Sequence, residues 1–410
     1  MMYFQRHLET VVNRISKRKP VIVLTGARQV GKSTMLKTSL KGVNYIAMDM
    51  PPVRESAINE PSLFFERYKP PVIIDEIQKA AGLFEYIKDS ADTDRKKGQF
   101  YLTGSQSLAL MKNISESLAG RAGVIKMLGL SMRELDGITY REPFSPSLKA
   151  FTEMSKSACA FSYETVVNRI HKGFFPELYE TKSDLHDWSD FYDSYLQTYI
   201  EKDIRDVLQI QDESAFLRFV RMTAALTGQM LNISAIADSC GKDINTAKRW
   251  LSVMESSGLI YLLKPYYNNL NKRLIKTPKL YFLDTGLACW LLGWNTPQQL
   301  TSGAMWGHIF ESFVVTEILK SYYNDGIVEA PLYYYRDKDK NEVDIIIQSG
   351  NTLHPVEIKT TGDPQKSMIS SFTQLETLPG ITRGCGAVIC MAREVLPMTK
   401  TDSVIPVSYI

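Results

Sequence analysis

The sequence predicts an α/β protein built from three consecutive parts, which we expect at residues 1–148, 149–295 and 296–410. One observation is length: 410 residues are enough for about three domains, and 44% hydrophobic residues are enough to give each domain a core. The other is the pattern along the chain. Short β-branched runs alternate with helical segments in the first part, helices dominate the second, and strands return in the third.

The overall composition excludes several classes of protein. The 48 basic and 45 acidic residues leave a net charge of +3, so any nucleic-acid or membrane partner must bind a local patch. Five cysteines without a Cys-x-x-Cys pair argue against a disulfide framework and a zinc site, and favour free thiols in a reducing cytoplasm. Charges interrupt the N-terminal apolar stretches, and no run reaches about 18 apolar residues, so we expect no signal peptide and no membrane partner.

The first part predicts a buried parallel sheet with strands at residues 21–24, 43–46, 72–74 and 100–102. The first strand runs into a segment that fits Gly-x-x-x-x-Gly-Lys-Ser and opens a helix, which is the context of a phosphate-binding loop (P-loop). Its glycines let backbone N–H groups surround phosphates, its lysine reaches the β- and γ-phosphates, and its serine would hold magnesium. The predicted nucleotide-binding residues are Gly26, Ala27, Arg28, Gln29, Val30, Gly31, Lys32, Ser33 and Thr34.

Two adjacent acids end the strand at residues 72–74. We expect Asp75 to bind magnesium through water and Glu76 to polarise the attacking water. The strand at residues 100–102 ends in small hydroxyl side chains, and either Thr103 or Ser105 would sense the γ-phosphate. The alternative for these two residues is a simple helix cap.

The second part contains a helix-turn-helix pattern at residues 231–239 and 244–257, followed by a strand at residues 258–262. This order predicts a helical lid with a winged helix. The stretch from residue 258 to 283 has no acid and interleaves basic residues, Lys279 among them, with tyrosines, which suits contact with a DNA backbone. The alternative is a winged helix used only for packing between domains. The predicted DNA contacts are Lys248, Arg249, Lys264, Lys272, Arg273 and Lys276.

The third part carries a second acidic constellation. Asp344 lies in a predicted strand, and the next strand carries Glu357 and Lys359, which leave the same face because they are two residues apart. A helix at residues 310–320 adds Glu311, and Glu317 on the same helix and Glu342 are spare candidates. Asp344 and Glu357 could hold a divalent metal that activates water at a phosphodiester, and Lys359 would position the nucleophile or stabilise the leaving oxyanion. The alternative is a salt-bridged strand face.

The order of the N-terminal motifs resembles that of the AAA+ ATPases, and more closely a bacterial and archaeal branch with a C-terminal DUF4143 region. The segments that carry this resemblance are GARQVGKST, VIIDEIQ, FYLTGSQ and SLAGRAGVIKMLGLSMREL. The resemblance implies that Arg121 completes a neighbouring subunit's site as an arginine finger, and therefore that the chain forms a homo-oligomeric ring or partial ring. Arg28 and Arg133 are the alternative residues for compensating the phosphate charge. The family's motif Gly-Gly-Phe-Pro-Glu is replaced here by Gly173-Phe174-Phe175-Pro176-Glu177. We interpret this motif as structural and not catalytic.

The C-terminal constellation looks like the PD-(D/E)xK nuclease superfamily, which implies a restriction-endonuclease-like α/β domain with Glu311, Asp344, Glu357 and Lys359 at its site. The sequence therefore predicts an ATPase that uses ATP and Mg²⁺ to bind and process duplex or branched DNA, with Mg²⁺ or Mn²⁺ at the nuclease-like site. Two alternatives stay open. One is a nucleotide-dependent oligomeric switch in defence or signalling whose C-terminal domain does not cleave, and the other is a motor that remodels branched DNA.

Overall fold

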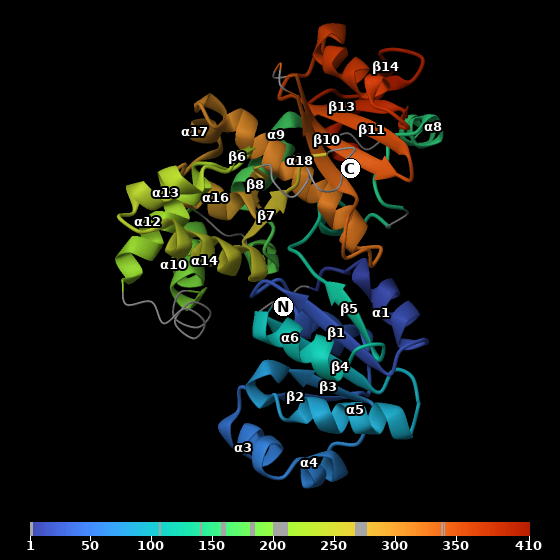
Figure 1. Cartoon of the computed structure of the whole chain (residues 1–410), viewed down its shortest axis with the longest axis vertical. Helices are drawn as coiled ribbons and strands as arrows, with labels where there is room; N and C mark the ends of the chain where they lie inside the picture. Colours follow the sequence, from blue (N-terminus) through green and yellow to red (C-terminus); the bar gives the residue numbers. More distant parts are fainter. Residues whose placement is uncertain are drawn as a thin grey trace.

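The computed structural model describes residues 3–105, 108–139, 142–156, 161–180, 185–199, 212–266, 277–337, 339 and 341–410. The fold is mixed α/β, as the sequence predicts. Two large sheets lie at opposite ends of the molecule, with most of the helices of the middle region between them and to one side (Figure 1). Among the described residues, no helix is both long enough and apolar enough to cross a membrane.

The N-terminal sheet is parallel and has the strand order β2-β3-β4-β1-β5. Its strands are β1 (Val21–Gly26), β2 (Asn44–Ala47), β3 (Val72–Asp75), β4 (Phe100–Ser105) and β5 (Ala122–Lys126). β1 is buried throughout, because Ile22 and Leu24 pack into the core shared with α1 while Val21 and Val23 pack into a second core on the other face. The four strands predicted in this part are confirmed within three residues at either end.

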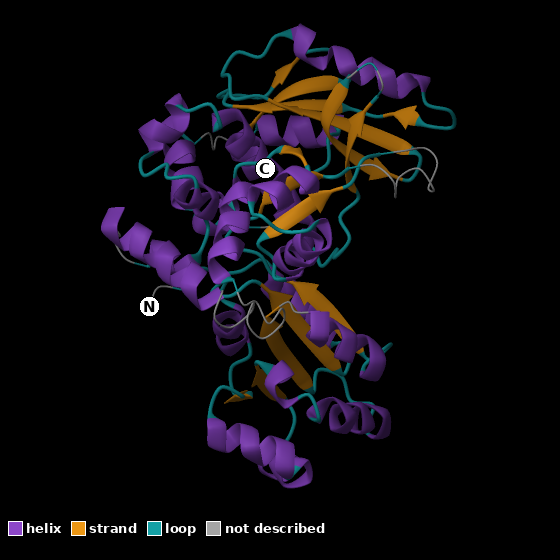
Figure 2. Ribbon diagram, turned by 60° about the vertical axis from the view of Figure 1, so that its left-hand side comes forward, coloured by secondary structure: helices purple, strands orange, loops and turns teal. Residues whose placement is uncertain are grey.

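Helices cover both faces of this sheet (Figure 2). One face carries α1 (Leu8–Ser16) and α2 (Lys32–Ser39), and the other carries α3 (Pro51–Asn59), α4 (Pro61–Arg67), η1 (Ile77–Ala80), α5 (Leu83–Thr93) and α6 (Leu108–Ser117). After β5, the short helix α7 (Met132–Leu135) begins with a capping box, in which Ser131 and Glu134 satisfy each other's backbone N–H groups.

The middle region begins with helices: α8 (Leu148–Ser155), α9 (Tyr163–Lys172), η2 (Pro176–Tyr179) and α10 (Leu185–Tyr199). The aromatic stripe of α10 forms core, because Tyr192, Tyr195 and Tyr199 are each at most 2% exposed. The chain continues through α12 (Glu213–Ala224), β6 (Gln229–Met230), α13 (Ile233–Ser239), α14 (Ile244–Ser256), β7 (Ile260–Leu263) and β8 (Lys279–Phe282). β8 is the central strand of a small antiparallel sheet of order β6-β8-β7.

The last region begins after α16 (Thr285–Leu291) and α17 (Pro297–Ser302) with the long helix α18 (Trp306–Tyr323). α18 is buried along most of its length, and it lies between the two large sheets (Figure 1). Its sheet has the order β14-β15-β13-β11-β10-β9, with β12 beside β11. The strands are β9 (Leu332–Arg336), β10 (Glu342–Ser349), β11 (Thr352–Ile358), β12 (Thr382–Arg383), β13 (Gly386–Cys390), β14 (Leu396–Pro397) and β15 (Asp402–Pro406), with η4 (Lys366–Thr377) and η5 (Val407–Tyr409).

One hydrophobic cluster connects the whole chain, from Leu8 in α1 to Ile410. Two smaller clusters cover the outer faces of the sheets, one beneath α3 to α6 and one between η4 and the C-terminal sheet. Because the large cluster continues across all three parts, they pack as one body.

Candidate functional site

The P-loop joins β1 to α2 at the carboxyl edge of the parallel sheet. A side chain on Gly26 would come within 2.1 Å of the carbonyl oxygen of Met127, so only glycine fits there. Gly31 is left-handed (φ 92°) at the start of α2, a conformation that glycine adopts at little cost. The buried Lys32 ammonium donates to the carbonyls of Gly26 (3.1 Å) and Ala27 (2.7 Å), so the cation lies inside the loop.

Arg6, which belongs to none of the sequence motifs, anchors the P-loop. Its guanidinium donates to the carbonyl of Val30 (2.8 Å) and that of Leu128 (2.8 Å). Its Nε forms a buried ion pair with Glu134 (3.0 Å). Arg6 therefore ties the P-loop to the segment after β5 and to α7.

Three hydroxyl groups converge on Asp75. Ser33 Oγ lies 2.7 Å from one carboxylate oxygen, Tyr45 donates to the other at 2.5 Å, and the buried Thr103 hydroxyl contacts the first. Burial, followed by the hydrogen bond to Asp75, raises the pKa of Tyr45, so this phenol stays a neutral donor. The predicted magnesium pair, Ser33 and Asp75, is therefore assembled, and its donors are the hydroxyl and carboxylate that this metal prefers.

Glu76 stands directly beside this cluster in an unusual conformation. Its backbone is left-handed (φ 56°, ψ 45°), which is uncommon for a residue other than glycine, and its N–H points to Thr103 Oγ1 at 3.4 Å. Gln78 Nε2 donates to its carboxylate at 2.5 Å. Of the two sensor candidates, Thr103 touches the acidic pair, whereas the side chain of Ser105 lies outside the described residues.

A cleft of about 370 Å³ opens over the P-loop. Glu76 lines this cleft, and so do Pro176 and Glu177 of the segment that we interpreted as structural. The same segment also packs against α18, because Phe174 stacks on Phe313 of α18 with ring centroids 5.6 Å apart. The lining residues are Arg28, Gln29, Gly31, Lys32, Ser33, Thr34, Glu76, Pro176, Glu177, Glu180 and Thr198.

The three arginine candidates lie in different places. Arg28 lines the cleft, and Arg133 Nη2 donates to the carbonyl of Tyr409 at 2.6 Å. Arg121 precedes β5 at the amino edge of the sheet, opposite the P-loop, where it forms an exposed ion pair with Asp92. Arg121 is thus outside the cleft of its own chain.

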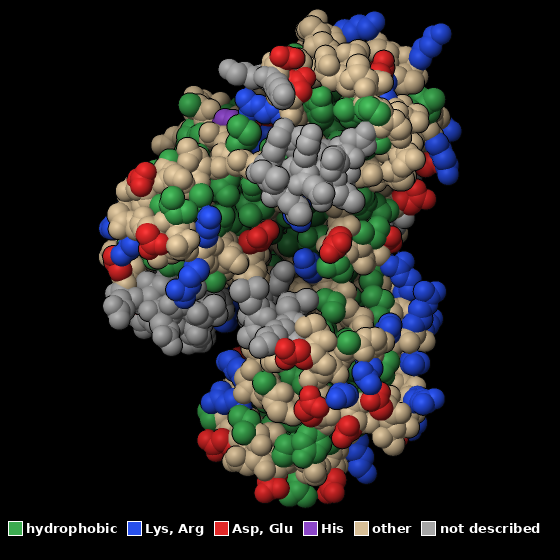
Figure 3. Space-filling model, viewed as in Figure 1, with side chains coloured by type: hydrophobic (Ala, Val, Ile, Leu, Met, Phe, Trp, Pro, Cys, Tyr) green, Lys and Arg blue, Asp and Glu red, His purple; other side chains and the backbone are tan. Residues whose placement is uncertain are grey.

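The predicted DNA contacts are partly on the surface. Lys248 and Arg249 on α14 and Lys264 after β7 are exposed, whereas Lys272, Arg273 and Lys276 lie outside the described residues. Lys279 is only 3% exposed, so it does not belong to a surface patch. Counting it among the basic residues suited to contact with a DNA backbone was therefore wrong. In the view of Figure 3, basic side chains also gather along the flank beside α1, and Lys17 and Arg18 directly after this helix are exposed.

The C-terminal sheet brings the second predicted constellation together. Glu357 and Lys359 share a face, with Lys359 Nζ 2.5 Å from Glu357 Oε1. The Asp344 carboxylate accepts the backbone N–H of Ile358 at 2.9 Å. Burial, followed by the charge of Asp344, raises the pKa of Glu311 to about 7 and that of Glu357 to about 8.

An additional lysine lies inside this cluster. Lys279 Nζ is 3.0 Å from Glu311, 2.6 Å from Glu342 and 3.7 Å from Asp344. Burial alone would lower the pKa of Lys279, but the three carboxylates outweigh it and hold that pKa above its usual value. Tyr281 donates to Glu311 at 2.7 Å. No group of three metal-ligating side chains that could hold an ion occurs among the residues described, so this arrangement does not fit a metal.

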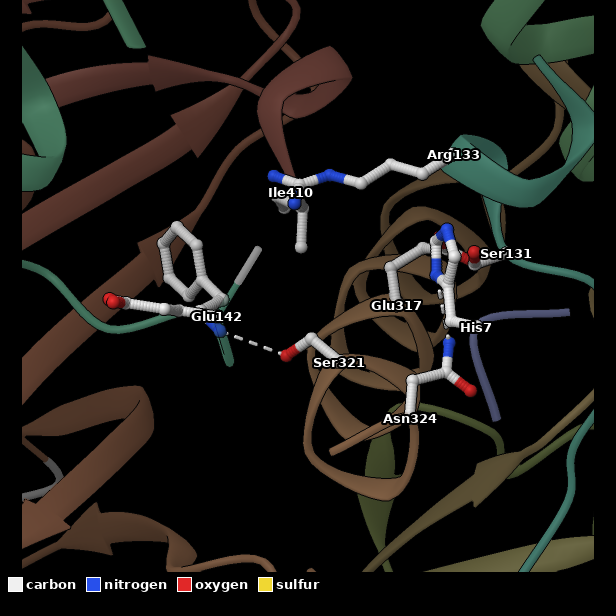
Figure 4. Close-up of a pocket in the computed structure, with 9 residues that line it drawn as sticks. His7, Ser131, Arg133, Glu142, Glu317, Ser321, Asn324 and Ile410 are labelled. Atoms are coloured by element: carbon white, nitrogen blue, oxygen red, sulfur yellow. Dashed lines mark hydrogen bonds between the residues drawn. The ribbon is translucent and has the colours of Figure 1, made fainter. Parts of the chain in front are cut away.

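The other half of α18 contacts the N-terminal region. Glu317 accepts the backbone N–H of Met132 at 2.9 Å, and Lys320 donates to the carbonyl of Leu130 at 2.7 Å. Figure 4 shows Glu317 and Ser321 of α18, and Asn324 directly after it, around a small pocket that His7 and Ser131 of the N-terminal region also line. α18 therefore contacts the segment after β5 through its later turns and carries Glu311 in its first turns.

Three family descriptions match the chain. Residues 18–136 match "AAA domain", residues 163–298 match "Domain of unknown function (DUF8612)" and residues 306–410 match "Domain of unknown function (DUF4143)". Over 380 residues, the chain is 26% identical to "Uncharacterized protein Rv2008c" of Mycobacterium tuberculosis (strain ATCC 25618 / H37Rv), covering 92% of this chain and 79% of that protein. The same values hold for "Uncharacterized protein Mb2031c" of Mycobacterium bovis (strain ATCC BAA-935 / AF2122/97).

Solved structures that match the chain include the Walker-type ATPase PABY2304 of Pyrococcus abyssi, with 16% identity and a TM-score of 0.46 over 70% of this chain and 96% of that one. AMPPCP-bound DnaA from Aquifex aeolicus matches with 11% identity and a TM-score of 0.25 over 60% of this chain and 85% of that one. The resemblance stated from the motifs is confirmed by the family matches: the chain carries an AAA domain toward its N-terminal end and a DUF4143 domain at its C-terminal end.

Proposed function

We propose that the chain binds ATP with Mg²⁺ at the P-loop and hydrolyses it. The observation that carries this proposal is the contact of Ser33 Oγ with Asp75 at 2.7 Å, beside Glu76 and at the edge of a cleft lined by the P-loop. Bound Mg²⁺ would supply positive charge to the phosphate oxygens. Ser33 and Asp75 would hold it, Lys32 and the loop N–H groups would bind the phosphates, and Glu76 would orient the attacking water.

The direct test is phosphate release by a Glu76→Gln variant. This change keeps the size of the side chain but removes the carboxylate, so ATP should still bind while turnover falls by at least tenfold. Glu85→Gln, which alters an exposed acid of the same domain, is the matched control and should hydrolyse ATP like the wild type. Unchanged turnover in Glu76→Gln would refute the assigned role.

The order helix, strand, two helices and two strands over α12 to β8 supports a winged helix, and the exposed Lys248, Arg249 and Lys264 support DNA backbone contact. The same unit also packs between domains. The chain after β7 continues the pairing into β9, with Tyr266 N donating to the carbonyl of Tyr334 at 2.6 Å. We propose that DNA binds the α14 side, in a sequence-tolerant manner.

A Lys248→Glu/Arg249→Glu variant tests this interface. Each reversed charge removes a phosphate contact, so affinity for duplex and branched DNA should fall and the dependence of binding on salt should become less steep. Lys149→Glu, at an exposed lysine of α8, is the control and should bind DNA normally. Equal affinity and equal salt dependence in the two variants would assign α14 to packing alone.

For the C-terminal domain, α18 and strands β9 to β11 support a nuclease-like fold, but the site does not fit a metal, so we derive no cleavage step.

The function that follows is a nucleotide-dependent switch on DNA, with Arg121 acting between copies of the chain. Wild-type protein should leave supercoiled plasmid intact in Mg²⁺ and Mn²⁺. Nicking that disappears in Asp344→Asn would overturn this assignment and restore the nuclease.

A further inference from the structure

Exposed cations line the amino edge of the N-terminal sheet, at the opposite end of its strands from the P-loop. Because the sheet is parallel, the loops that precede β2, β3, β4 and β1 follow one another along this edge in strand order. We call the exposed basic residues of these four loops the amino-edge stripe. They are Lys41 before β2, Lys69 before β3, Arg95, Lys96 and Lys97 before β4, and Lys17 and Arg18 before β1.

The two most basic loops of the stripe lie side by side. β4 and β1 are paired, and the backbone N–H of Gly98 before β4 donates to the carbonyl of Lys19 before β1 at 2.9 Å. Gly98 is left-handed (φ 63°), and a side chain there would come within 3.1 Å of the carbonyl oxygen of Ser16. Glycine therefore lets the loops approach closely, and their basic residues form one patch on the flank beside α1 (Figure 3).

Acidic side chains do not neutralise this patch. Asp94 is the one acid within residues 16–20 and 94–99. Asp92, just before the second loop, forms its ion pair with Arg121. In the part of the chain that the structure describes, no ion pair is found for the cations of the stripe. Their charge is therefore available to an anion from outside the chain.

A simpler role for such cations is to compensate helix dipoles. The four loops follow the C-terminal ends of α2, α4, α5 and α1, where backbone carbonyl groups attract positive charge. One cation at each end satisfies this need, as Lys41 does after α2 and Lys69 after α4. Arg95, Lys96 and Lys97 in succession exceed it, and like charges at such short range repel one another unless an anion binds them.

We propose that the amino-edge stripe binds the phosphate backbone of duplex DNA, as a second contact separate from that of α14. Neighbouring strands lie about 4.8 Å apart, so cations on successive strands form a row that suits a linear polyanion. Residues 16–20 and 94–99 contain no aromatic side chain on which unpaired bases could stack, which favours a duplex over a single strand. They also contain no large apolar side chain that could enter a membrane.

The stripe and the nucleotide cleft lie at opposite edges of the same sheet. The middle region covers the carboxyl edge, where a side chain on Gly31 would lie 3.7 Å from the ring of Pro176. DNA on the stripe would therefore leave the cleft free, and we expect it to bind equally with and without ATP. The inference goes beyond the proposed ATPase and holds whether or not ATP is hydrolysed.

The test is the affinity of full-length protein for a fluorescent DNA duplex, measured by anisotropy over a range of salt concentrations. The variants are Lys17→Glu/Arg18→Glu and Lys96→Glu/Lys97→Glu. Each should bind the duplex at least tenfold more weakly, with a salt dependence shallower by about two in the logarithmic slope, because two phosphate contacts are lost. The same losses should appear without ATP and in a Lys248→Glu/Arg249→Glu background, which separates the stripe from α14.

Lys149→Glu/Lys156→Glu is the matched control, because it changes the net charge equally at exposed lysines on α8 and directly after it. It should bind the duplex like the wild type. Lys96→Gln/Lys97→Gln replaces the reversed-charge variant if thermal unfolding shows that the latter is not folded. Wild-type affinity and slope in the variants of both loops would overturn the proposal, and so would an equal loss in the control. Weaker binding to phosphatidylserine vesicles with unchanged duplex binding would also overturn it and assign the stripe to an anionic membrane.

Discussion

At the scale of single residues, some neighbours of Asp75 and the P-loop could be predicted from local motifs and others could not. Ser33 and Asp75 are recognisable because each lies in a short motif at a strand end, where parallel strands bring their carboxyl ends to one edge. Tyr45 and Arg6 carry no such motif. Tyr45 reaches Asp75 because β2 lies beside β3, and Arg6 reaches Val30 because α1 covers that side of the sheet. Neighbours of this kind follow from strand order, which no local pattern encodes.

Thr103 gives the first prediction at this scale. Its hydroxyl contacts Asp75 and accepts from the N–H of Glu76, so Thr103→Val removes a contact to a charged group without changing the shape. We expect ATP binding to persist and kcat to fall by about tenfold to a hundredfold, the equivalent of about 1.5–3 kcal/mol. Steady-state phosphate release with a parallel binding measurement checks this. If Ser105→Ala shows that loss and Thr103→Val does not, Ser105 is the sensor.

At the scale of elements, the helices of the middle region were recognisable from their period, but their polar contacts were not. His171 belongs to no recognisable sequence motif, yet its side chain connects the end of α9 to two other segments. Its ring stacks on Trp188 of α10 with centroids 4.6 Å apart, and its Nε2 lies 2.8 Å from the carbonyl of Trp294. These partners are distant in sequence, so only packing brings them together.

His171 also predicts how stability depends on pH. Burial lowers the pKa of His171, so the unfolded chain takes up a proton below about pH 6.5 while the folded chain resists protonation. Stability from this residue is therefore complete above that pH and is lost as the pH falls toward the folded pKa. Denaturant unfolding between pH 5 and 8 should show this slope in the wild type and a shallower slope in His171→Phe. An unchanged slope would assign the acid sensitivity to other groups.

At the scale of the whole molecule, α18 connects the two sites that the sequence analysis treated separately. Its first turns carry Glu311, and its later turns carry Glu317 and Lys320, which contact the segment that Arg6 ties to the P-loop. The helix was predicted, but Glu317 was considered only as a spare candidate for the acidic site, whereas it contacts Met132. A helix interior is rigid, so a shift of that segment would be transmitted along its axis.

This connection predicts a long-range effect of ATP on hydrogen exchange. In the wild type, ATP should slow amide exchange in β1 and α2 and also in α18. Glu317→Ala removes the acceptor of the Met132 N–H, so ATP should still protect the P-loop while the effect on α18 disappears. Glu329→Ala, at a residue after the helix, is the control and should keep both effects. Equal protection of α18 in the two variants would exclude Glu317 from the coupling.

The central claim is that the loop between β1 and α2 binds ATP, and calorimetric titration with ATP and Mg²⁺ tests it most directly. We expect wild-type protein to take up about one ATP per chain, as a single P-loop requires. Lys32→Ala, which removes the cation held inside that loop, should bind at least tenfold more weakly. Saturable binding of equal strength by both proteins, or no heat of binding by either, would contradict the account.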